Sequence, residues 1–429
     1  MKFNNLKIKL SPTLKINNYA VEKIENNEEV FHFGFGESRF PVPNILQENL
    51  KKYANQHSYL EGIGLKKLRQ NISKYLNERY NMDTVGDKII ITPGSKLGIY
   101  TTLMALEGDL LHINPSWVSY MPQAKMLNKQ VININTKIDN NYFPTAEKLE
   151  STIKMSIEQG YNPKIIIFNT PNNPTGQMLS KEQINSIIPV LRKYDITVIS
   201  DEIYAEVNYK KEHVSFFNHY ENTIITSGFS KHLSLGGWRI GYIVLPKNVS
   251  DSVINIYKAI ISETWSSVNA PVQYAIADTL ENYKELDFYL NVCKKAHFIR
   301  MQYIVENLKA LGIKINSSDG AFYVYPDFEN YKECLEKNNI KSNNDLAEIL
   351  VSKYNVATLS GVSFGEREKF TLRMAYSYLD MENEEKSINF YNQIKDINND
   401  KKFNDKVLEL SVNLKKGIEK IKLFLQDIK

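Results

Sequence analysis

Short runs of Ile and Val recur along the middle of the chain, and polar stretches with helical periodicity separate them. The runs are apolar at consecutive positions, which is typical of strands covered on both faces in a mostly parallel sheet. One of the helical patterns, 180–194, opens on Ser180 with Glu182 and Gln183 in its first turn. This alternation predicts a doubly wound α/β region over about residues 60–290. The predicted strands are 88–92, 164–168, 196–200, 223–227 and 241–245.

The pattern changes on both sides of this region. The loop 34–43 (GFGESRFPVP) precedes it, and a more helical segment with the hairpin-like stretch 320–328 (GAFYVYPDF) follows it. We interpret the two ends as a second, smaller α+β domain. Residues 379–410 are rich in Asn, Asp, Glu and Lys, which predicts a solvated helix and a linker, and 407–427 should dock as a closing helix. The expected division is 1–58 for an arm and part of the small domain, 59–290 for the large domain, and 291–429 for the small C-terminal domain.

Composition sets broad limits on function. Of 429 residues, 42% are hydrophobic and 24% are charged, as in a globular protein with a sizeable core. The net charge of +4 gives no indication of a nucleic-acid or membrane partner. Cys293 and Cys334 match neither a disulfide framework nor a metal-ligand spacing, which fits a reducing compartment. The start, MKFNNLKIKL, lacks the apolar core of a signal peptide, so we expect a cytoplasmic protein. The spacing of the cysteines gives no indication of a metal site.

Polar residues follow four of the predicted strands, at the edge where ligands bind in an open α/β sheet. After the first strand, Gly94, Ser95 and Lys96 open a helix whose free N–H groups suit a phosphate. A plain helix cap would give the same pattern. After the second, the loop 169–176 (NTPNNPTG) presents the amides of Asn172 and Asn173, although such residues are equally typical of a tight turn.

The next two strand ends carry ionisable groups. Asp201 and Tyr204 lie in DEIYAE, where a buried acid would need a cationic partner, although such an acid can also be solvated or cap a turn. Lys231 lies in SGFSKHLSLGGWRIGY, with Arg239 eight residues later. A lysine among small and apolar residues can lose its proton and attack a carbonyl carbon, and an arginine can hold a phosphate or carboxylate with two hydrogen bonds. Together the four strand ends describe a site for a phosphorylated, protonated pyridine aldehyde.

In order and spacing over about residues 30–380, these motifs resemble the class I/II aminotransferase family of fold-type I pyridoxal 5'-phosphate (PLP) enzymes. The resemblance implies an α/β fold with a mostly parallel sheet between helices, plus a smaller α+β domain from both chain ends. It implies PLP as cofactor and a ping-pong transfer of an amino group between an L-amino acid and a 2-oxo acid. It also implies a homodimer with shared active sites.

The resemblance gives a role to each matching residue. Lys231 corresponds to the lysine that forms a Schiff base with the cofactor and later moves a proton. Asp201 matches the acid that pairs with the pyridinium nitrogen, and Tyr204 and Asn173 match the pair that hydrogen-bonds the ring's phenolic oxygen. Arg373, in FTLRMAYSY, matches the arginine that clamps the substrate α-carboxylate.

Other positions complete the implied site. Trp117, in NPSWVSY, falls where the family stacks an aromatic ring on the pyridine, and the loop ending at Gly36 would cover the substrate. Tyr59 matches a tyrosine that reaches the phosphate of the neighbouring subunit. Gly228 stands where many relatives have a second serine, so that phosphate contact should be missing. The implied phosphate ligands of the same chain are Gly94, Ser95, Lys96, Ser230 and Arg239, with Ser227 as an addition.

The substrate side chain stays open at this point. Arg39 could meet a distal carboxylate, Glu263 could repel one, and Trp265 could form an apolar wall for an aromatic side chain. Because these cues point in different directions, they assign no substrate. Two alternatives also stay open: a PLP-dependent lyase, cyclase or oxidase acting on an amino acid, and a non-catalytic ligand sensor with an aminotransferase-like domain.

Overall fold

The structure is a computed structural model that describes residues 19, 22–23, 26, 28–209 and 212–429. The first 18 residues of the expected arm lie outside the described residues. They include MKFNNLKIKL, on which the expectation of no signal peptide depends. No helix in the described part of the chain is both long and apolar enough to cross a membrane.

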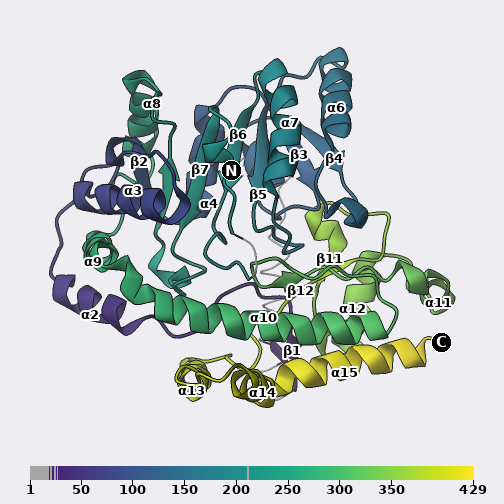
Figure 1. The fold of residues 1–429 in the computed structure, drawn as a ribbon. Coiled ribbons are helices and arrows are strands. Elements are labelled where there is room, and N and C mark those ends of the chain that lie inside the picture. The colour runs from purple at the N-terminus through teal and green to yellow at the C-terminus, as the bar shows by residue number, and fades with distance from the viewer. Residues whose placement is uncertain (1–18, 20–21, 24–25, 27, 210–211) are drawn as a thin grey trace, which may run out of the picture.

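A seven-stranded sheet forms the centre of the larger lobe, in the order β2-β8-β7-β6-β5-β3-β4 (Figure 1). Neighbours from β7 to β4 are parallel, whereas β8 is antiparallel to both β2 and β7. The predicted α/β class is therefore confirmed. The strands are β2 (Ile89–Thr92), β3 (Asp109–Asn114), β4 (Val131–Asn135), β5 (Pro163–Asn169), β6 (Thr197–Asp201), β7 (Thr223–Gly228) and β8 (Gly241–Val244).

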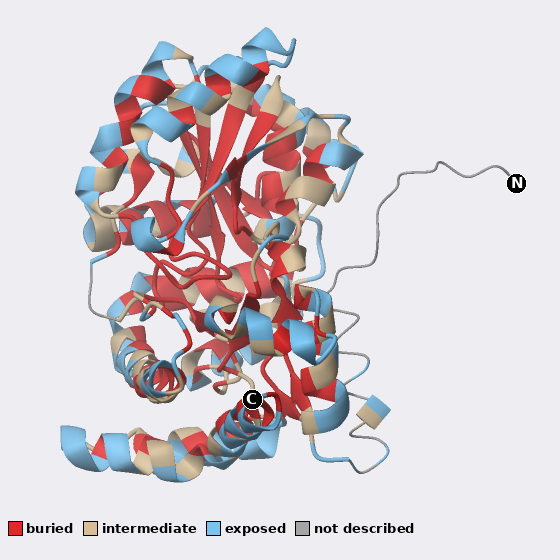
Figure 2. Cartoon of the chain, turned by 90° about the vertical axis from the view of Figure 1, so that its right-hand side faces the viewer, coloured by how far each residue is buried: buried red, intermediate tan, exposed pale blue. Residues whose placement is uncertain are grey.

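Helices lie on both faces of this sheet, and the buried strands run between them (Figure 2). The predicted start of α7 is confirmed, because Ser180 Oγ accepts from the Gln183 N–H while the Gln183 side chain accepts from the Ser180 N–H. The helices of this lobe are α2 (Asn44–Tyr53), α3 (Lys66–Tyr80), α4 (Ser95–Ala105), α5 (Tyr120–Met126), α6 (Ala146–Glu158), α7 (Lys181–Lys193), α8 (Asp251–Ser262) and α9 (Ala270–Glu281). The long helix α10 (Asp287–Ala310) connects this lobe to the smaller one (Figure 1).

The smaller lobe contains two short sheets. β1 (Phe31–His32) pairs in parallel with β10 (Val356–Ala357). β12 (Leu372–Ala375) lies between β11 (Leu359–Ser360) and β9 (Tyr323–Val324), antiparallel to both. The prediction of a hairpin over 320–328 is wrong, because β9 finds its partner in the distant β12, which a local pattern cannot show. Helices α11 (Lys332–Lys337) and α12 (Asn343–Tyr354) belong to the same lobe.

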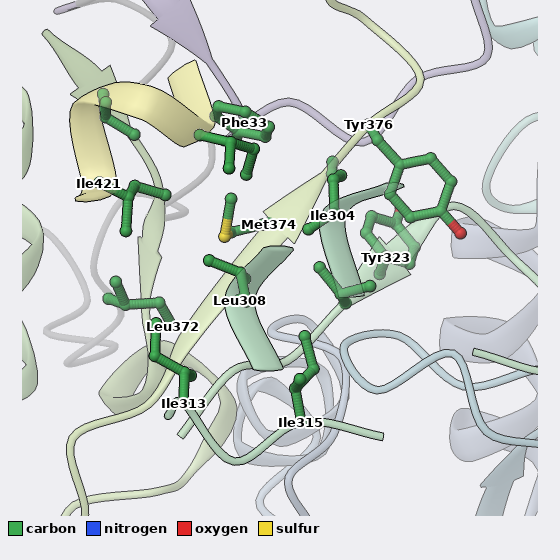
Figure 3. Close-up of a cluster of buried hydrophobic side chains, with 14 of the residues drawn as sticks. Phe33, Ile304, Leu308, Ile313, Ile315, Tyr323, Leu372, Met374, Tyr376 and Ile421 are labelled. Atoms are coloured by element: carbon green, nitrogen blue, oxygen red, sulfur yellow. The ribbon is translucent and has the colours of Figure 1, made fainter. Parts of the chain in front are cut away.

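The C-terminal end is more ordered than its composition indicates. Residues 379–410 form α13 (Glu384–Ile394) and α14 (Asp400–Leu410), and Phe390 and Phe403 are buried against the core. The prediction of a linker there is wrong, because widely spaced apolar residues still bury one face of each helix. The predicted closing helix is confirmed as α15 (Val412–Asp427), which begins after a break at Ser411. Figure 3 shows Ile421 of α15 in one apolar cluster with Phe33 and Met374.

Candidate active site

The carboxyl ends of β2, β5, β6 and β7 meet segments of the smaller lobe around a cavity of about 370 Å³. β2 runs parallel to β7, because both are antiparallel to β8 between them, so their carboxyl ends reach the same edge. Gly94 and Tyr59 do not line the cavity. The predicted residues that do are Gly36, Ser95, Lys96, Trp117, Asn173, Asp201, Tyr204, Ser230, Lys231, Arg239 and Arg373.

Asp201 ends β6 as a carboxylate that is only 3% exposed. The Tyr120 hydroxyl donates to its Oδ2, and the Ile203 N–H donates to its Oδ1 at 3.3 Å. Burial raises the pKa of Asp201 to about 6, against the opposing effect of the Tyr120 hydrogen bond. No salt bridge to Asp201 occurs among the described residues. A cationic ligand could therefore form one with this carboxylate.

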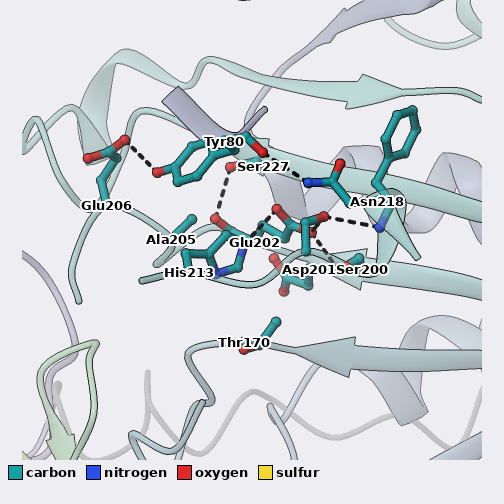
Figure 4. Close-up of polar contacts among 12 residues, drawn as sticks. Tyr80, Thr170, Ser200, Asp201, Glu202, Ala205, Glu206, His213, Asn218 and Ser227 are labelled. Atoms are coloured by element: carbon teal, nitrogen blue, oxygen red, sulfur yellow. Dashed lines mark hydrogen bonds and ion pairs between the residues drawn. The ribbon is translucent and has the colours of Figure 1, made fainter. Parts of the chain in front are cut away.

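The next residue, Glu202, fixes the turn that carries Asp201 (Figure 4). Its carboxylate accepts from Ser200 Oγ at 2.7 Å and contacts His213 Nε2 at 2.8 Å. Because successive side chains leave a strand on opposite faces, anchoring Glu202 on one side directs Asp201 to the other. Ser227 Oγ donates to the Glu202 carbonyl at 3.1 Å and does not line the cavity, which argues against its addition to the phosphate ligands.

Lys231 follows β7 and brings its amine into the cavity. Its Nζ donates to the Gly36 carbonyl at 2.9 Å and lies 5.8 Å from the ring centroids of Tyr204 and Phe322. Burial lowers the pKa of Lys231 to about 8, although the charge of Glu37 opposes this shift. A substantial fraction of this amine is therefore neutral near physiological pH, as a nucleophile requires.

Arg373 lies on β12 and is buried, with 2% of its surface exposed. Its Nη2 donates to the Gly34 carbonyl and its Nη1 to Asn173 Oδ1 at 3.4 Å. The guanidinium also lies over the rings of Tyr323 and Phe364, at 4.7 and 5.3 Å from their centroids. Its Nε has no hydrogen-bond partner among the residues that the structure describes. A buried cation with a free donor and only neutral partners is suited to a carboxylate ligand.

Cationic and hydroxyl groups gather at the other end, around the N-terminus of α4. Gly94 caps this helix with a φ of 80°, and Ser95 and Lys96 are its first two residues. Arg239 donates to the carbonyls of Gly236 at 2.9 Å and Pro93 at 3.5 Å, which holds it beside the same helix end. Free N–H groups, hydroxyls and a guanidinium in one place favour phosphate.

Comparison with known proteins agrees with this geometry. The family described as aminotransferase class I and II matches residues 28–389. The chain belongs to that family. It is 30% identical to an aspartate aminotransferase of Thermotoga maritima over 326 residues, which cover 74% of this chain and 82% of that protein. A solved aspartate aminotransferase from Thermus thermophilus with maleate superposes with a TM-score of 0.79 at 25% identity, over 91% of this chain and 98% of that one. A solved aspartate aminotransferase from Thermotoga maritima also superposes with a TM-score of 0.79 at 25% identity, over 99% of this chain and 100% of that one.

This aminotransferase is therefore a PLP-dependent transferase, as the motifs implied. The site fits the cofactor on its own chemistry. Among the described residues Asp201 forms no salt bridge, and a protonated ring nitrogen would supply one. Lys231 has the lowered pKa that reaction with an aldehyde needs. The α4 N-terminus and Arg239 offer donors for a phosphate.

Three hypotheses about the substrate do not agree with the aminotransferase structure. Arg39 already donates to the carbonyls of Met381 and Glu382 and to Glu37, so it is not free to meet a distal carboxylate. Neither Glu263 nor Trp265 lines the cavity. The missing serine at Gly228 has a steric reason, because a Cβ there would lie 2.8 Å from the Gly241 Cα of the neighbouring strand.

Several residues of the aminotransferase site were not predicted from the sequence, and three of them are polar side chains with a part in the argument. Tyr120 bonds Asp201, while Glu37 and Tyr323 line the cavity. Tyr120 lies three residues after Trp117, and this proximity is the one feature of the sequence that could have identified it as a site residue. Both tyrosines lie in apolar stretches, where a tyrosine is typical of a core.

Proposed function

We propose that this aminotransferase holds PLP in the 370 Å³ cavity, with Asp201 facing the ring nitrogen and Lys231 as the covalent anchor. Arg373 would bind the α-carboxylate of the amino acid or 2-oxo acid. The observation that carries the proposal is that one cavity contains a buried carboxylate and a buried guanidinium, neither of which forms a salt bridge among the described residues. Each of these charges would be met by a group that the cofactor or the substrate carries.

The remaining ligands divide between the two ends of PLP. Tyr204 and Asn173 would hydrogen-bond the ring oxygen, and Trp117 would pack on the ring. Gly36 and Asn173 would also contact the substrate. The phosphate would be held by Gly94, Ser95, Lys96, Ser230 and Arg239. The donors at the start of α4 support this assignment, since a helix N-terminus favours an anion.

During the reaction PLP supplies the electron sink that lets the amino group leave the substrate. Lys231 would take the proton from the substrate Cα and deliver it to the C4′ carbon of the cofactor, because an amine with a pKa of about 8 can both accept and donate a proton near neutral pH. Arg373 would fix the carboxylate by two parallel hydrogen bonds, and the strand β12 keeps it in place. The rings of Phe322 and Tyr323 would exclude water from the Lys231 amine.

We also propose a homodimer with shared sites. Tyr59 is 91% exposed and does not line the cavity of its own chain. An exposed tyrosine that matches a cofactor ligand in the family supports a role in the partner's site. We further propose a cytoplasmic location, which the unpaired Cys293 and Cys334 support, and the division into 1–58, 59–290 and 291–429.

The names of the relatives make aspartate the first amino donor to test. The decisive experiment is a panel of L-amino acids with 2-oxoglutarate or pyruvate as acceptor, with every product identified. We expect a 2-oxo acid from the donor and a new amino acid from the acceptor in equal amounts, and none from Lys231→Ala. Turnover of the donor without an acceptor would instead indicate a lyase or an oxidase.

A further inference from the structure

We propose that Tyr323 is a positioning residue that joins the two ends of the site, by holding the Tyr204 hydroxyl and the Arg373 guanidinium in one arrangement. The inference rests on the proposed roles of Tyr204 and Arg373. Tyr323 begins β9 and lies opposite Ala375 of β12, the strand that carries Arg373. A single side chain therefore touches both the expected cofactor contact and the expected carboxylate contact.

The contact with Tyr204 has a defined direction when a ligand is bound. The two hydroxyl oxygens are 2.6 Å apart, and the rings meet edge to face with centroids 5.6 Å apart. A phenol has one proton to donate and can accept hydrogen bonds. If Tyr204 gives its proton to a ligand oxygen, then the proton in the 2.6 Å contact must come from Tyr323. A hydroxyl that accepts a hydrogen bond becomes a stronger donor, so Tyr323 would strengthen the bond from Tyr204 to the ligand.

The contact with Arg373 uses the ring instead of the hydroxyl. The guanidinium carbon of Arg373 lies 4.7 Å from the Tyr323 ring centroid, within the range of a cation–π interaction. This contact occupies one face of the guanidinium and leaves the in-plane Nε free of any partner. The ring therefore supports Arg373 without competing for the hydrogen bonds that a carboxylate would use.

The loop over the site is built around the same hydroxyl. A Cβ on Gly36 would lie 2.2 Å from the Tyr323 hydroxyl oxygen, so only glycine lets the loop come this close. The Gly36 carbonyl accepts from Lys231 at 2.9 Å and lies 3.4 Å from the Tyr323 hydroxyl. Tyr323 thus also sets how near this loop lies to Lys231.

The surroundings hold Tyr323 in place. It is 1% exposed and packs in the cluster that contains Ile304 and Tyr376 (Figure 3). The charged groups that act on the tyrosine pair are Arg373 from β12, Asp201 from β6 and Lys231 after β7. A conservative change at Tyr323 leaves all three in place, so its effect can be assigned to the lost group.

The test separates the hydroxyl from the ring in the PLP-loaded enzyme. Tyr323→Phe should raise the pH midpoint of the change in the cofactor's visible absorption by about half to one pH unit. The reason is that a weaker donor at Tyr204 stabilises the ring oxyanion less, by an amount set by one hydrogen bond. The KM for the amino donor should change less than about twofold, because the ring still supports Arg373. Tyr323→Leu should give the same spectral shift and raise KM about five- to tenfold.

A matched control comes from the same strand region. Tyr325 is also buried, but its hydroxyl bonds Thr371 at 2.9 Å and does not line the cavity. Tyr325→Phe should therefore leave both the midpoint and KM unchanged. If Tyr323→Phe behaved like Tyr325→Phe, the inference would be overturned. Should Tyr323→Leu fail to fold, Tyr323→Phe decides alone, with thermal unfolding as the check on its integrity.

Two further variants distinguish this inference from the proposed function. Tyr204→Phe should shift the midpoint at least as far as Tyr323→Phe; an unchanged midpoint would contradict the role of Tyr204 itself. The double variant Tyr204→Phe/Tyr323→Phe should shift the midpoint no further than Tyr204→Phe, because Tyr323 acts through Tyr204. Additive shifts would show that Tyr323 acts on the cofactor independently and would overturn the positioning role.

Discussion

Replacing Asp201 with Asn should make the protein without cofactor more stable while it inactivates the loaded enzyme. The carboxylate is 3% exposed, and burial raises its pKa from 3.8 to about 6. A carboxyl group with a raised folded-state pKa contributes its full stability below the unfolded pKa and loses it as the pH rises through the folded pKa. At 1.36 kcal/mol for each pKa unit, the ionised Asp201 lowers the free energy of unfolding by about 3 kcal/mol at pH 8.

The substitution also has a local cost. The carbonyl oxygen of Asn can still accept from the Tyr120 hydroxyl, but its NH2 group cannot accept from the Ile203 N–H, which in the wild type donates to Asp201 at 3.3 Å. Losing that bond costs about 1 kcal/mol. The expected net gain is about 2 kcal/mol at pH 8, and it should shrink as the pH falls below about 6, because the wild-type carboxyl group then becomes neutral.

The measurement is thermal unfolding of both proteins without cofactor, followed by circular dichroism at pH 8 and pH 5. We expect a Tm several degrees higher for the variant at pH 8 and a smaller difference at pH 5. Glu202→Gln serves as the control, because Glu202 is equally buried but bonded to Ser200 and His213, so its loss should lower Tm at both pH values. A lower Tm for Asp201→Asn at pH 8 would refute the idea of an uncompensated charge.

Other predictions concern Lys231, Arg373 and Tyr59. Without cofactor, the rate at which an aldehyde reagent labels Lys231 should rise with a midpoint at about pH 8, because burial lowers the pKa of this amine; a midpoint near 10 would contradict it. In steady-state kinetics, Arg373→Lys should lower kcat/KM about 10- to 100-fold for the amino donor and the 2-oxo acid alike, since a lysine cannot form two parallel hydrogen bonds; a loss for one substrate alone would argue against a shared carboxylate site. Tyr59→Phe should weaken PLP binding about fivefold in an absorbance titration while leaving the Tm of the cofactor-free protein unchanged. If Tyr59→Phe and the wild-type protein bound PLP with equal affinity, the result would argue against an active site shared between subunits.

The site was predictable where it depends on strand ends. Asp201 and Lys231 each follow a run of buried apolar residues, and parallel strands bring such positions to one edge. The local sequence pattern was therefore enough to predict that Asp201 and Lys231 lie close together. The hydroxyl of Tyr323 could not be found this way, because its partner Tyr204 lies on another element and the two meet only after both lobes have packed.

Strands and helices with mixed composition were harder to predict. β3 reads DLLHIN and β4 reads VININ, so polar residues interrupt the apolar run that marked the other strands. β4 lies at the edge of the sheet and needs apolar residues on fewer positions, which weakens its pattern. In α13 and α14 the abundant charges obscured the buried Phe390 and Phe403, because composition averages over the two faces of a helix.

The charges around the cavity explain why folding and cofactor binding should be coupled in this aminotransferase. Four cationic side chains and two carboxylates line it, an excess of two positive charges: Lys96, Lys231, Arg239 and Arg373 against Glu37 and Asp201. A phosphate group carries close to two negative charges at neutral pH, so it would balance this excess at the start of α4. A protonated ring nitrogen would in turn offset the about 3 kcal/mol that the ionised Asp201 costs the cofactor-free protein. Because a ligand that binds only the folded state stabilises it by mass action, the supply of PLP should set the stability of this fold as well as its activity.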